Sequence, residues 1–361
     1  MKITRKFEAQ LIPADAYWRE PTRYESKIDF AAIEESEGEA IHGHRLRLGL
    51  LLHAQREAIV RWTRSPRFSA ASARRVPKWF SWQIGNEFVR IWARGYWDGL
   101  EEYGRQIESA GEDPAGLRLS EAATRRLIEN AWTSGRAFAE KVLAPVRMIA
   151  DRAFGADGAR ILPPDRIEGE IRTAYARWIE PSDRKVDVSE IRLASPLDIL
   201  KTSWRSWQQR NSPIAAWLDW TIGSIKDEGG EIPILSETAT KRDVLTERNR
   251  QRVAAVYESG LSDPDVAYYQ YSAMRDSRTC SLCRSLDGTI RPKDDEFWYT
   301  ATPPMHQSCR CDLVTIVKKE AAKVTPIKSV DRRGWEKIPA GFGGYDPSLA
   351  AGDEVLVHAL P

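Results

Sequence analysis

The sequence predicts an α+β protein in three parts: a largely helical N-terminal region (residues 1–235), a small α+β domain (236–318) and an extended C-terminal arm (319–361). Three observations support this division. Apolar residues recur at three- and four-residue steps in the first part, and aromatic and β-branched residues cluster in the second. Glycine, proline and charged residues dominate the third.

Helical periodicity is clearest at residues 166–180, where Asp165 is the expected N-cap. A second amphipathic segment spans residues 127–142 and is expected to end or kink at Pro145. A third apolar stripe includes two glycines and consists of Phe88, Ile91, Trp92, Gly95 and Gly99. A further predicted helical stretch carries Trp204, Trp207, Trp217 and Trp220, whose indole rings suit contact with a partner. We therefore expect the N-terminal region to be a docking region.

The period changes in the small domain. Residues 243–259 have the pattern of a helix, and Gly260 is placed as its C-terminal stop. Strands are expected at residues 266–274, 296–300 and 313–317, with a tight turn at residues 287–288. This order of elements predicts a helix followed by hairpins.

The overall composition is that of an ordinary globular protein. Apolar residues make up 42% and charged residues 29% of the 361 residues, so a sizeable core is expected. The net charge of +2 excludes a polycation that coats nucleic acid along its whole length. The N-terminal residues lack the apolar stretch of a signal peptide, and no apolar run approaches the ~18 residues of a membrane span. We expect synthesis in a reducing cytoplasm and no membrane partner.

All four cysteines lie in one short window, and a histidine accompanies the second pair. The five possible donors are Cys280, Cys283, His306, Cys309 and Cys311. Two close pairs that fold together supply the nitrogen and sulfur ligands that tetrahedral zinc prefers. We predict a structural Zn²⁺ held by four of the five. The Cys-Arg-Cys spacing favours the four cysteines, but a set that includes His306 stays open.

Other states of the cysteines compete with structural zinc. In an exported protein they would form two disulfides, and in a plain core they would be buried thiols without a metal. A hydrolytic zinc needs a general base, and Glu296 is the only glutamate between the two pairs. The zinc deaminase signature is absent. We therefore predict no catalytic residue, no enzyme activity and no small-molecule substrate. Arg278, Arg284 and Arg310 are expected to offset the charge of the thiolates.

A basic segment at residues 61–78 contains no acidic residue. Its candidates for phosphate contact are Arg61, Arg64, Arg67, Arg74, Arg75 and Lys78. Trp62, Phe68, Trp79 and Phe80 are interleaved with them, and aromatic rings can stack on bases while cations neutralise phosphates. An exposed loop that contacts DNA is one interpretation, and a solvated or protein-docking loop is the other. On a predicted helix nearby, His42, His44 and His53 are expected to face solvent.

Three segments of the small domain resemble the phage Mu protein F family of minor head proteins. They are LTERNRQRVAAVYESG at residues 245–260, SAMRDSRTCSLCRSLDGTI at 272–290 and FWYTATPPMHQSCRCDLV at 297–314. Together they cover about 70 residues, roughly a fifth of the chain. Their order along the chain is as distinctive as the segments themselves.

The resemblance implies a non-enzymatic minor capsid protein that takes part in head morphogenesis at the portal vertex. The implied partners are the portal protein and capsid or scaffolding proteins, with phage DNA as a further partner during packaging or ejection. The implied location is the virion, in the capsid interior or at the portal vertex, after synthesis in the host cytoplasm. A DNA-binding zinc module and a metal-dependent hydrolase are the competing functions.

Overall fold

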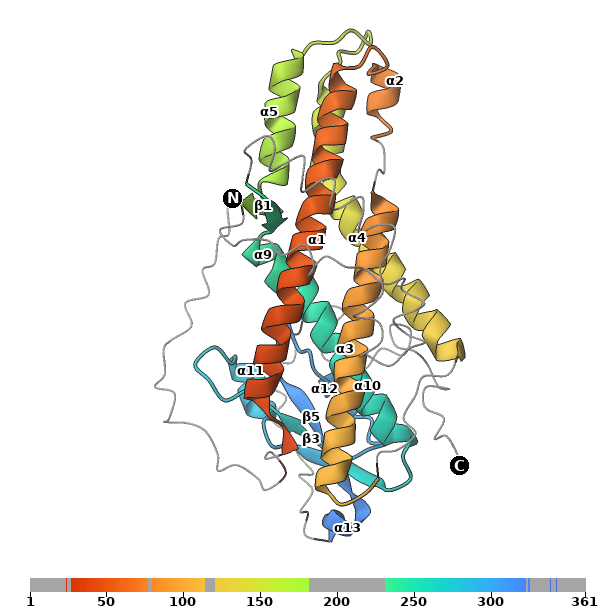
Figure 1. Cartoon of the computed structure of the whole chain (residues 1–361), viewed down its shortest axis with the longest axis vertical. Helices are drawn as coiled ribbons and strands as arrows, with labels where there is room; N and C mark the ends of the chain where they lie inside the picture. The colour runs from red at the N-terminus through yellow and green to blue at the C-terminus, as the bar shows by residue number, and fades with distance from the viewer. Residues whose placement is uncertain are drawn as a thin grey trace.

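The computed structural model describes residues 24, 27–76, 80–113, 121–181, 231–322, 324, 338 and 342. Helices and a small sheet combine in a largely helical α+β architecture (Figure 1), as predicted. The predicted tryptophan-rich stretch around residues 204–220 lies outside the described residues. Among the described helices, none has both the length and the apolar character needed to cross a membrane.

Long helices run along the molecule, with the sheet near one end (Figure 1). They are α1 (Phe30–Arg64), α3 (Ser81–Ser109) and α4 (Glu121–Arg152), with the shorter α2 (Ala70–Ala73) and α5 (Pro164–Tyr175) at the end away from the sheet. Their apolar stripes meet in one core that includes the fully buried side chains of Leu48, Ile59, Trp92, Phe138 and Ile171. Burial of these apolar stripes in the core contributes more to the stability of such helices than helix propensity alone.

Both predicted ends of the helix at residues 166–180 are wrong. Helix α5 begins at Pro164, so Asp165 lies within its first turn, where its charge interacts favourably with the helix dipole instead of capping the helix. The helix also ends at Tyr175, because the following residues form strand β1 (Ile179–Pro181). Helix α4 continues through Pro145 to Arg152, and buried Val146 and other apolar residues hold the turns beyond the proline in the core.

A short ribbon connects the helices to the C-terminal part. Strand β1 pairs antiparallel with β2 (Pro233–Leu235), with Ile179 opposite Leu235. This ribbon lies on α1 at Gly49, where an added β-carbon would be 2.4 Å from the α-carbon of Ile234. Only glycine allows so close an approach of helix and strand.

The chain then enters α9 (Glu237–Ala239), the π-helix η3 (Thr240–Leu245) and α10 (Thr246–Ser262). The predicted helix at residues 243–259 is therefore confirmed, with different ends. Gly260 lies inside α10 and does not stop it. A β-carbon at Gly260 would be 2.6 Å from the hydroxyl oxygen of Tyr269, so the sheet packs where a side chain would otherwise stand.

The sheet has the order β4-β3-β5, and both pairings are antiparallel. Strand β3 (Val266–Ser272) lies between β4 (Ile290–Pro292) and β5 (Asp312–Val317), which confirms two of the three predicted strands. The helices α11 (Ser281–Leu286), α12 (Trp298–Ala301) and α13 (Lys318–Ala321) complete the described part of this region.

The predicted strand at residues 296–300 is wrong, because part of it forms α12. Asp295 Oδ1 accepts a hydrogen bond of 2.8 Å from the Phe297 N–H and starts a turn. The indole of Trp298 donates to the Pro292 carbonyl at 2.8 Å and is fully buried. This tertiary contact outweighs the strand preference of the aromatic residues.

Helix α3 contributes side chains to two apolar cores. Its Trp92 lies in the helical core, whereas Tyr103 and Ile107 pack with the sheet. Its Gln106 also closes the edge of β5: the side-chain Nε2 donates to the Leu313 carbonyl at 3.1 Å, and Oε1 accepts from the Thr315 N–H at 2.7 Å. The exposed edge of a sheet invites pairing with other chains, and this amide prevents it.

Candidate metal centre

The first donor pair lies at the start of α11. Cys280 is the residue before the helix, and its Sγ accepts a hydrogen bond of 3.3 Å from the Cys283 N–H. The turn before it is set by Asp276, whose carboxylate accepts from the Arg278 N–H at 2.9 Å. The sequence DSRTCSLC therefore folds locally into a turn and a short helix that place both sulfurs on the same side.

The remaining donors, His306, Cys309 and Cys311, lie in and just after a turn that contacts α10. Below, the second donor pair means His306 and Cys309. The Cys309 N–H donates to the His306 carbonyl at 3.2 Å, and Ser308 takes the left-handed conformation with φ of 59°. Thr246 accepts from the Ser308 N–H at 2.9 Å, and Asn249 donates to the Cys309 carbonyl at 2.7 Å. These contacts explain why Thr246 and Asn249 accompany the cysteine window.

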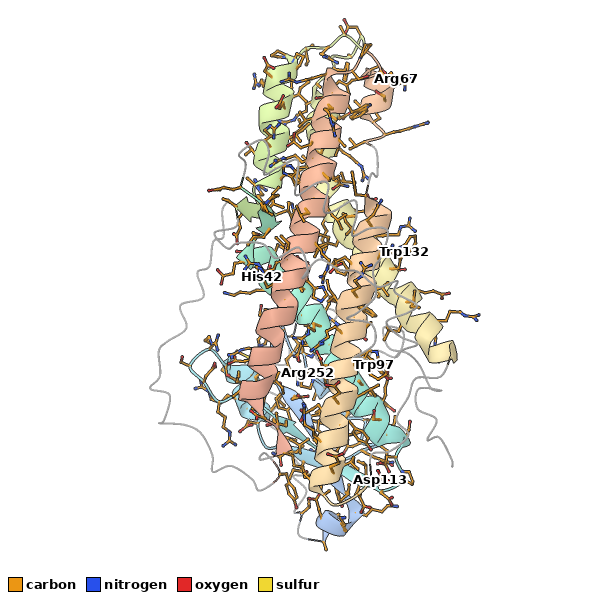
Figure 2. The ribbon with its side chains drawn as sticks, viewed as in Figure 1. His42, Arg67, Trp97, Asp113, Trp132 and Arg252 are labelled. Carbon is orange, nitrogen blue, oxygen red and sulfur yellow. The ribbon has the colours of Figure 1, made fainter. Side chains whose placement is uncertain are left out.

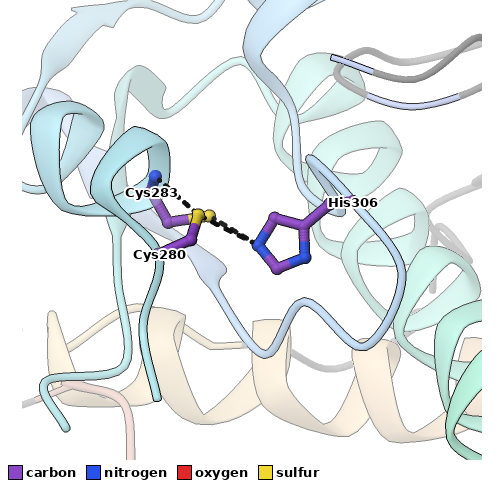
Figure 3. Close-up of side chains that lie close together, drawn as sticks. All are labelled: Cys280, Cys283 and His306. Atoms are coloured by element: carbon purple, nitrogen blue, oxygen red, sulfur yellow. Dashed lines mark hydrogen bonds between the residues drawn. The ribbon is translucent and has the colours of Figure 1, made fainter. Parts of the chain in front are cut away.

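The two pairs converge, as Figure 3 shows for Cys280, Cys283 and His306. His306 Nε2 lies 3.1 Å from Cys280 Sγ and 3.4 Å from Cys283 Sγ. Cys283 Sγ lies 3.8 Å from Cys309 Sγ. The donor atoms form two groups, each within 4.8 Å, and both include Cys283: one with Cys280 and His306, the other with Cys309 and Cys311.

Two of these separations are those expected of ligands on a tetrahedral zinc ion, and the His306–Cys280 separation of 3.1 Å is shorter. Zinc–sulfur bonds of about 2.3 Å and zinc–nitrogen bonds of about 2.0 Å place two tetrahedral sulfurs ~3.8 Å apart, and a sulfur and a nitrogen ~3.5 Å apart. The Cys283–Cys309 distance matches the first value, and the His306–Cys283 distance is close to the second. All five predicted donors lie in this cluster, and all four cysteines are free thiols.

The imidazole of His306 is oriented for coordination. Its Nδ1 lies 2.8 Å from the Gln307 carbonyl oxygen, which can only accept, so Nδ1 carries a proton. Nε2 faces the two sulfurs, and it offers its lone pair on that side once it is deprotonated. A backbone carbonyl that fixes the histidine tautomer is a common second contact of metal-ligating histidines.

The contacts also favour a thiolate. Hydrogen bonds with Cys283 and with His306 lower the pKa of Cys280 to about 4, and the contact with Cys280 raises the pKa of His306 to about 9. Cys280 is therefore ionised at neutral pH, which is the form that binds a soft metal ion. Binding of a metal ion to His306 Nε2 would displace the proton from this nitrogen.

The three arginines predicted to offset the thiolate charge pair with carboxylates or a carbonyl. Arg310 binds both oxygens of Asp276 at 2.8 Å, and also Glu34 of α1 at 3.0 Å. Arg278 contacts the same Glu34 oxygen at 3.3 Å, and Arg284 donates to the Thr279 carbonyl. Arginines beside each donor pair thus connect the two pairs to each other and to the start of α1.

Glu296, the only candidate for a general base, is exposed and belongs to neither group of donor atoms. Sequence reasoning missed the roles of Glu34, Thr246 and Asn249. Glu34 lies 244 positions before Arg278, the nearer of its two arginines, and no local pattern reveals such a pairing.

The basic segment forms the far end of the helical body, where Figure 2 labels Arg67. Helix α1 continues to Arg64, which pairs with Asp165 at 3.2 Å and with Glu168. The other described candidates are exposed: Arg61, Arg67, Arg74 and Arg75. Lys78 lies outside the described residues.

The prediction that Phe68 could stack on nucleic-acid bases is wrong, because its ring is buried. The ring is only 4% exposed, and it packs edge-on against Trp62 with 4.8 Å between the ring centroids. The guanidinium of Arg160 covers it at 5.0 Å. Trp62, Phe68 and Phe154 thus form a small aromatic cluster that Arg160 covers.

One histidine prediction is also wrong. His44 is buried at the junction of α1 and α3, where its Nδ1 lies 2.5 Å from Glu87 Oε1. Arg47 and Arg90 bind the same carboxylate at 2.8 and 3.1 Å. A buried charge needs such partners, and the sequence spacing could not reveal them.

Comparison with known proteins supports the resemblance. Residues 225–314 match the family model described as Phage Mu protein F like protein, a range that holds all five donors. The chain is 33% identical over 147 residues to the Mu-like prophage FluMu F protein of Haemophilus influenzae. This match covers 39% of the chain and 35% of the relative, so it spans about a third of that protein's length. No solved structure matches the chain significantly.

Proposed function

We propose that the chain, whose residues 225–314 match the Phage Mu protein F like family model, is a non-enzymatic minor head protein that takes part in phage head morphogenesis. The observation that carries the proposal is that one matched region contains the whole donor cluster together with the helix that supports it. The family match supports the role in the phage head. The donor cluster explains why the matched region contains these cysteines and this histidine.

We propose one structural zinc ion held by Cys280, Cys283, His306 and Cys309, with Cys311 as a buried fifth donor outside the set. Cys280 with Cys283, and His306 with Cys309, are each separated by two residues and closed by a local hydrogen bond. Cys283 belongs to both groups of donor atoms, and its Sγ lies 3.8 Å from Cys309 Sγ, the separation of two tetrahedral zinc ligands. This set differs from the four-cysteine set that the spacing alone favoured. Four protein ligands leave no position for a substrate water, so the role is structural.

The proposed partners are other head proteins: the portal protein and the capsid or scaffolding proteins. A protein with two separate ends suits a position between partners, because the sheet region and the basic end lie far apart on the body (Figure 1). The proposed location is the head, at the portal vertex.

Co-assembly tests the proposal. The full chain, its Cys283→Ser variant and a Cys311→Ser control would each be expressed with the portal, scaffold and capsid proteins of the same phage. Purified heads are expected to contain the wild-type chain and the control at a fixed ratio to portal, and the Cys283→Ser variant at a ratio at least tenfold lower. Heads that form normally and contain no wild-type chain would contradict the proposal.

A second candidate function, contact with the DNA backbone, is favoured by the basic end. Within the described part of the chain, no carboxylate pairs with Arg61, Arg67, Arg74 or Arg75. Exposed guanidinium groups bind DNA phosphates whatever the base sequence, and no exposed aromatic ring is needed for this contact.

Salt titration of duplex binding tests this candidate. Changing the four arginines to glutamine should weaken binding at low salt and reduce the slope of log K against log salt by about 3 to 4, because each lost phosphate contact contributes ~0.9. Arg166→Gln, which removes an exposed arginine paired with Glu170, is the control. Equal slopes for all three proteins would exclude the basic end as a DNA contact.

A further inference from the structure

A cavity of about 280 Å³ lies between α4, η3 and α10, beside the turn that carries the second donor pair. Phe88 and Phe138 contribute apolar surface, and Gln307 lines the side next to His306. The π-helical turn of η3 brings Arg242 and Asp243 into the same wall. Such turns are frequent at functional sites, because the extra residue redirects side chains.

The cavity has an excess of positive charge. Lys141, Arg242 and Arg250 line it, against the carboxyl groups of Asp243 and Glu247. Asp243 is shared by two of the cations, since Arg242 binds it at 2.7 Å and Lys141 at 3.5 Å. Arg250 in turn pairs with Glu247 at 3.7 Å, so three cations share two carboxylates. An acidic ligand with an apolar anchor fits this combination.

The C-terminal segment supplies such an anchor. Phe342 also lines the cavity, and its ring lies 5.3 Å from the guanidinium carbon of Arg250, within cation–π distance. Four residues earlier, Ile338 packs on the core of the sheet region. In the sequence, glycines stand at positions 341, 343 and 344 on either side of Phe342.

The sequence after this anchor is complementary in charge to the cavity. Residues 343–361 contain Asp346, Asp353 and Glu354 and no lysine or arginine. Asp346 is four residues beyond Phe342, which corresponds to a reach of up to about 14 Å for an extended chain. A carboxylate can therefore reach the cationic wall while the ring stays beside Arg250.

We propose that this cavity, formed by α4, η3 and α10, is a receptor for an aromatic–acidic peptide segment and that its occupant is the chain's own C-terminal segment, anchored by Phe342. The carboxylates that follow the anchor pair with Lys141, Arg242 and Arg250. Docking there also covers Gln307, whose carbonyl orients the His306 ring, so the segment straps the metal-binding turn to the helical body.

Peptide binding to full-length protein tests the proposal. A synthetic peptide of residues 338–361 would be titrated into wild-type chain and into Phe342→Ala, whose own segment has lost its anchor. The peptide is expected to bind Phe342→Ala at least tenfold more tightly than wild type. Adding Arg250→Gln to this variant should weaken binding at least tenfold, whereas Arg166→Gln on α5 should not change it. A peptide in which the three acidic residues are replaced by their amides should also bind at least tenfold more weakly.

Each other result contradicts the proposal. Equal peptide affinity for wild type and Phe342→Ala would show that Phe342 does not occupy the cavity. Full affinity in the presence of Arg250→Gln would place the peptide elsewhere, provided that the circular dichroism spectrum of the variant is native. A photo-crosslinker at position 342 that joins isotopically labelled to unlabelled chains would assign the occupant to a second copy and overturn docking within one chain.

Discussion

Gly99 of α3 lies directly against the backbone carbonyl of Arg252 on α10: a β-carbon at this glycine would be 2.1 Å from that oxygen. Gly95, one turn earlier, has the same relation to the carbonyl of Arg248. The two helices therefore touch through backbone, and α10 carries the residues that support the donor turn. The α3–α10 contact therefore fixes where the donor turn lies relative to the helical body.

Gly99→Ala should destabilise the protein by about 1–3 kcal/mol, because the added methyl group has no space and the helices must separate. Urea denaturation measures the change. The matched control is Gly169→Ala in α5, where no atom lies within 4 Å of the new methyl group. There, alanine should stabilise the helix by up to about 1 kcal/mol. Similar effects of the two substitutions would contradict this view of the α3–α10 contact.

Gln106→Ala should expose the edge of β5 and leave buried backbone groups of Leu313 and Thr315 without their partner. The expected loss is about 2–4 kcal/mol, since each orphaned group costs roughly 1–3 kcal/mol. Amide hydrogen exchange of Thr315, followed by NMR, should become faster than in Ser109→Ala, which alters the same helix away from the strand. Unchanged protection of Thr315 would show that Gln106 does not close the edge.

The donor cluster could be predicted because its information is local: two close pairs of soft ligands have one common chemical use. The apolar stripe through Gly95 and Gly99 was also visible, but its partner α10 is distant in the sequence, and spacing alone does not name a partner helix. Trp298 shows the opposite error, because aromatic residues typical of a strand became helical once the indole found the Pro292 carbonyl. The buried His44 depended on charges from another helix.

His44→Asn should change the acid stability of the protein. Burial, reinforced by the Arg47 charge, lowers the pKa of His44 from 6.5 to about 4, so the unfolded chain takes up a proton at a higher pH than the folded one. Wild type is therefore expected to lose about 3 kcal/mol as the pH falls from 6.5 to about 4. Asparagine keeps a donor for Glu87 but does not titrate, so this loss should disappear.

Glu87 provides the internal comparison for this experiment. Burial opposes its ionisation, but the Arg47 guanidinium and the hydrogen bond from His44 outweigh burial and lower its pKa to about 2. Its contribution is present above about pH 4.5 and is lost as the pH falls toward 2, in wild type and variant alike. Urea midpoints between about pH 7 and pH 3 separate the two windows. Parallel curves for both proteins across this range would refute the role of His44.

Glu34→Gln should loosen the start of α1 from the metal-binding turns, because it removes the carboxylate that Arg278 and Arg310 share. Hydrogen exchange of residues 30–38 should increase severalfold while global stability falls by less than about 1 kcal/mol, as expected for a partly exposed ion pair. Glu170→Gln, which removes a similarly placed carboxylate from α5, should leave this segment unchanged. No difference between the two variants would show that the arginine bridge does not hold α1.

The proposed zinc site is tested most directly by its coordination, which zinc K-edge X-ray absorption of the purified full-length chain measures. We predict one zinc per chain with three sulfur ligands at about 2.3 Å and one nitrogen ligand at about 2.0 Å. A first shell of four sulfurs would contradict the assignment of His306, and a folded chain that retains no metal would contradict the metal centre itself.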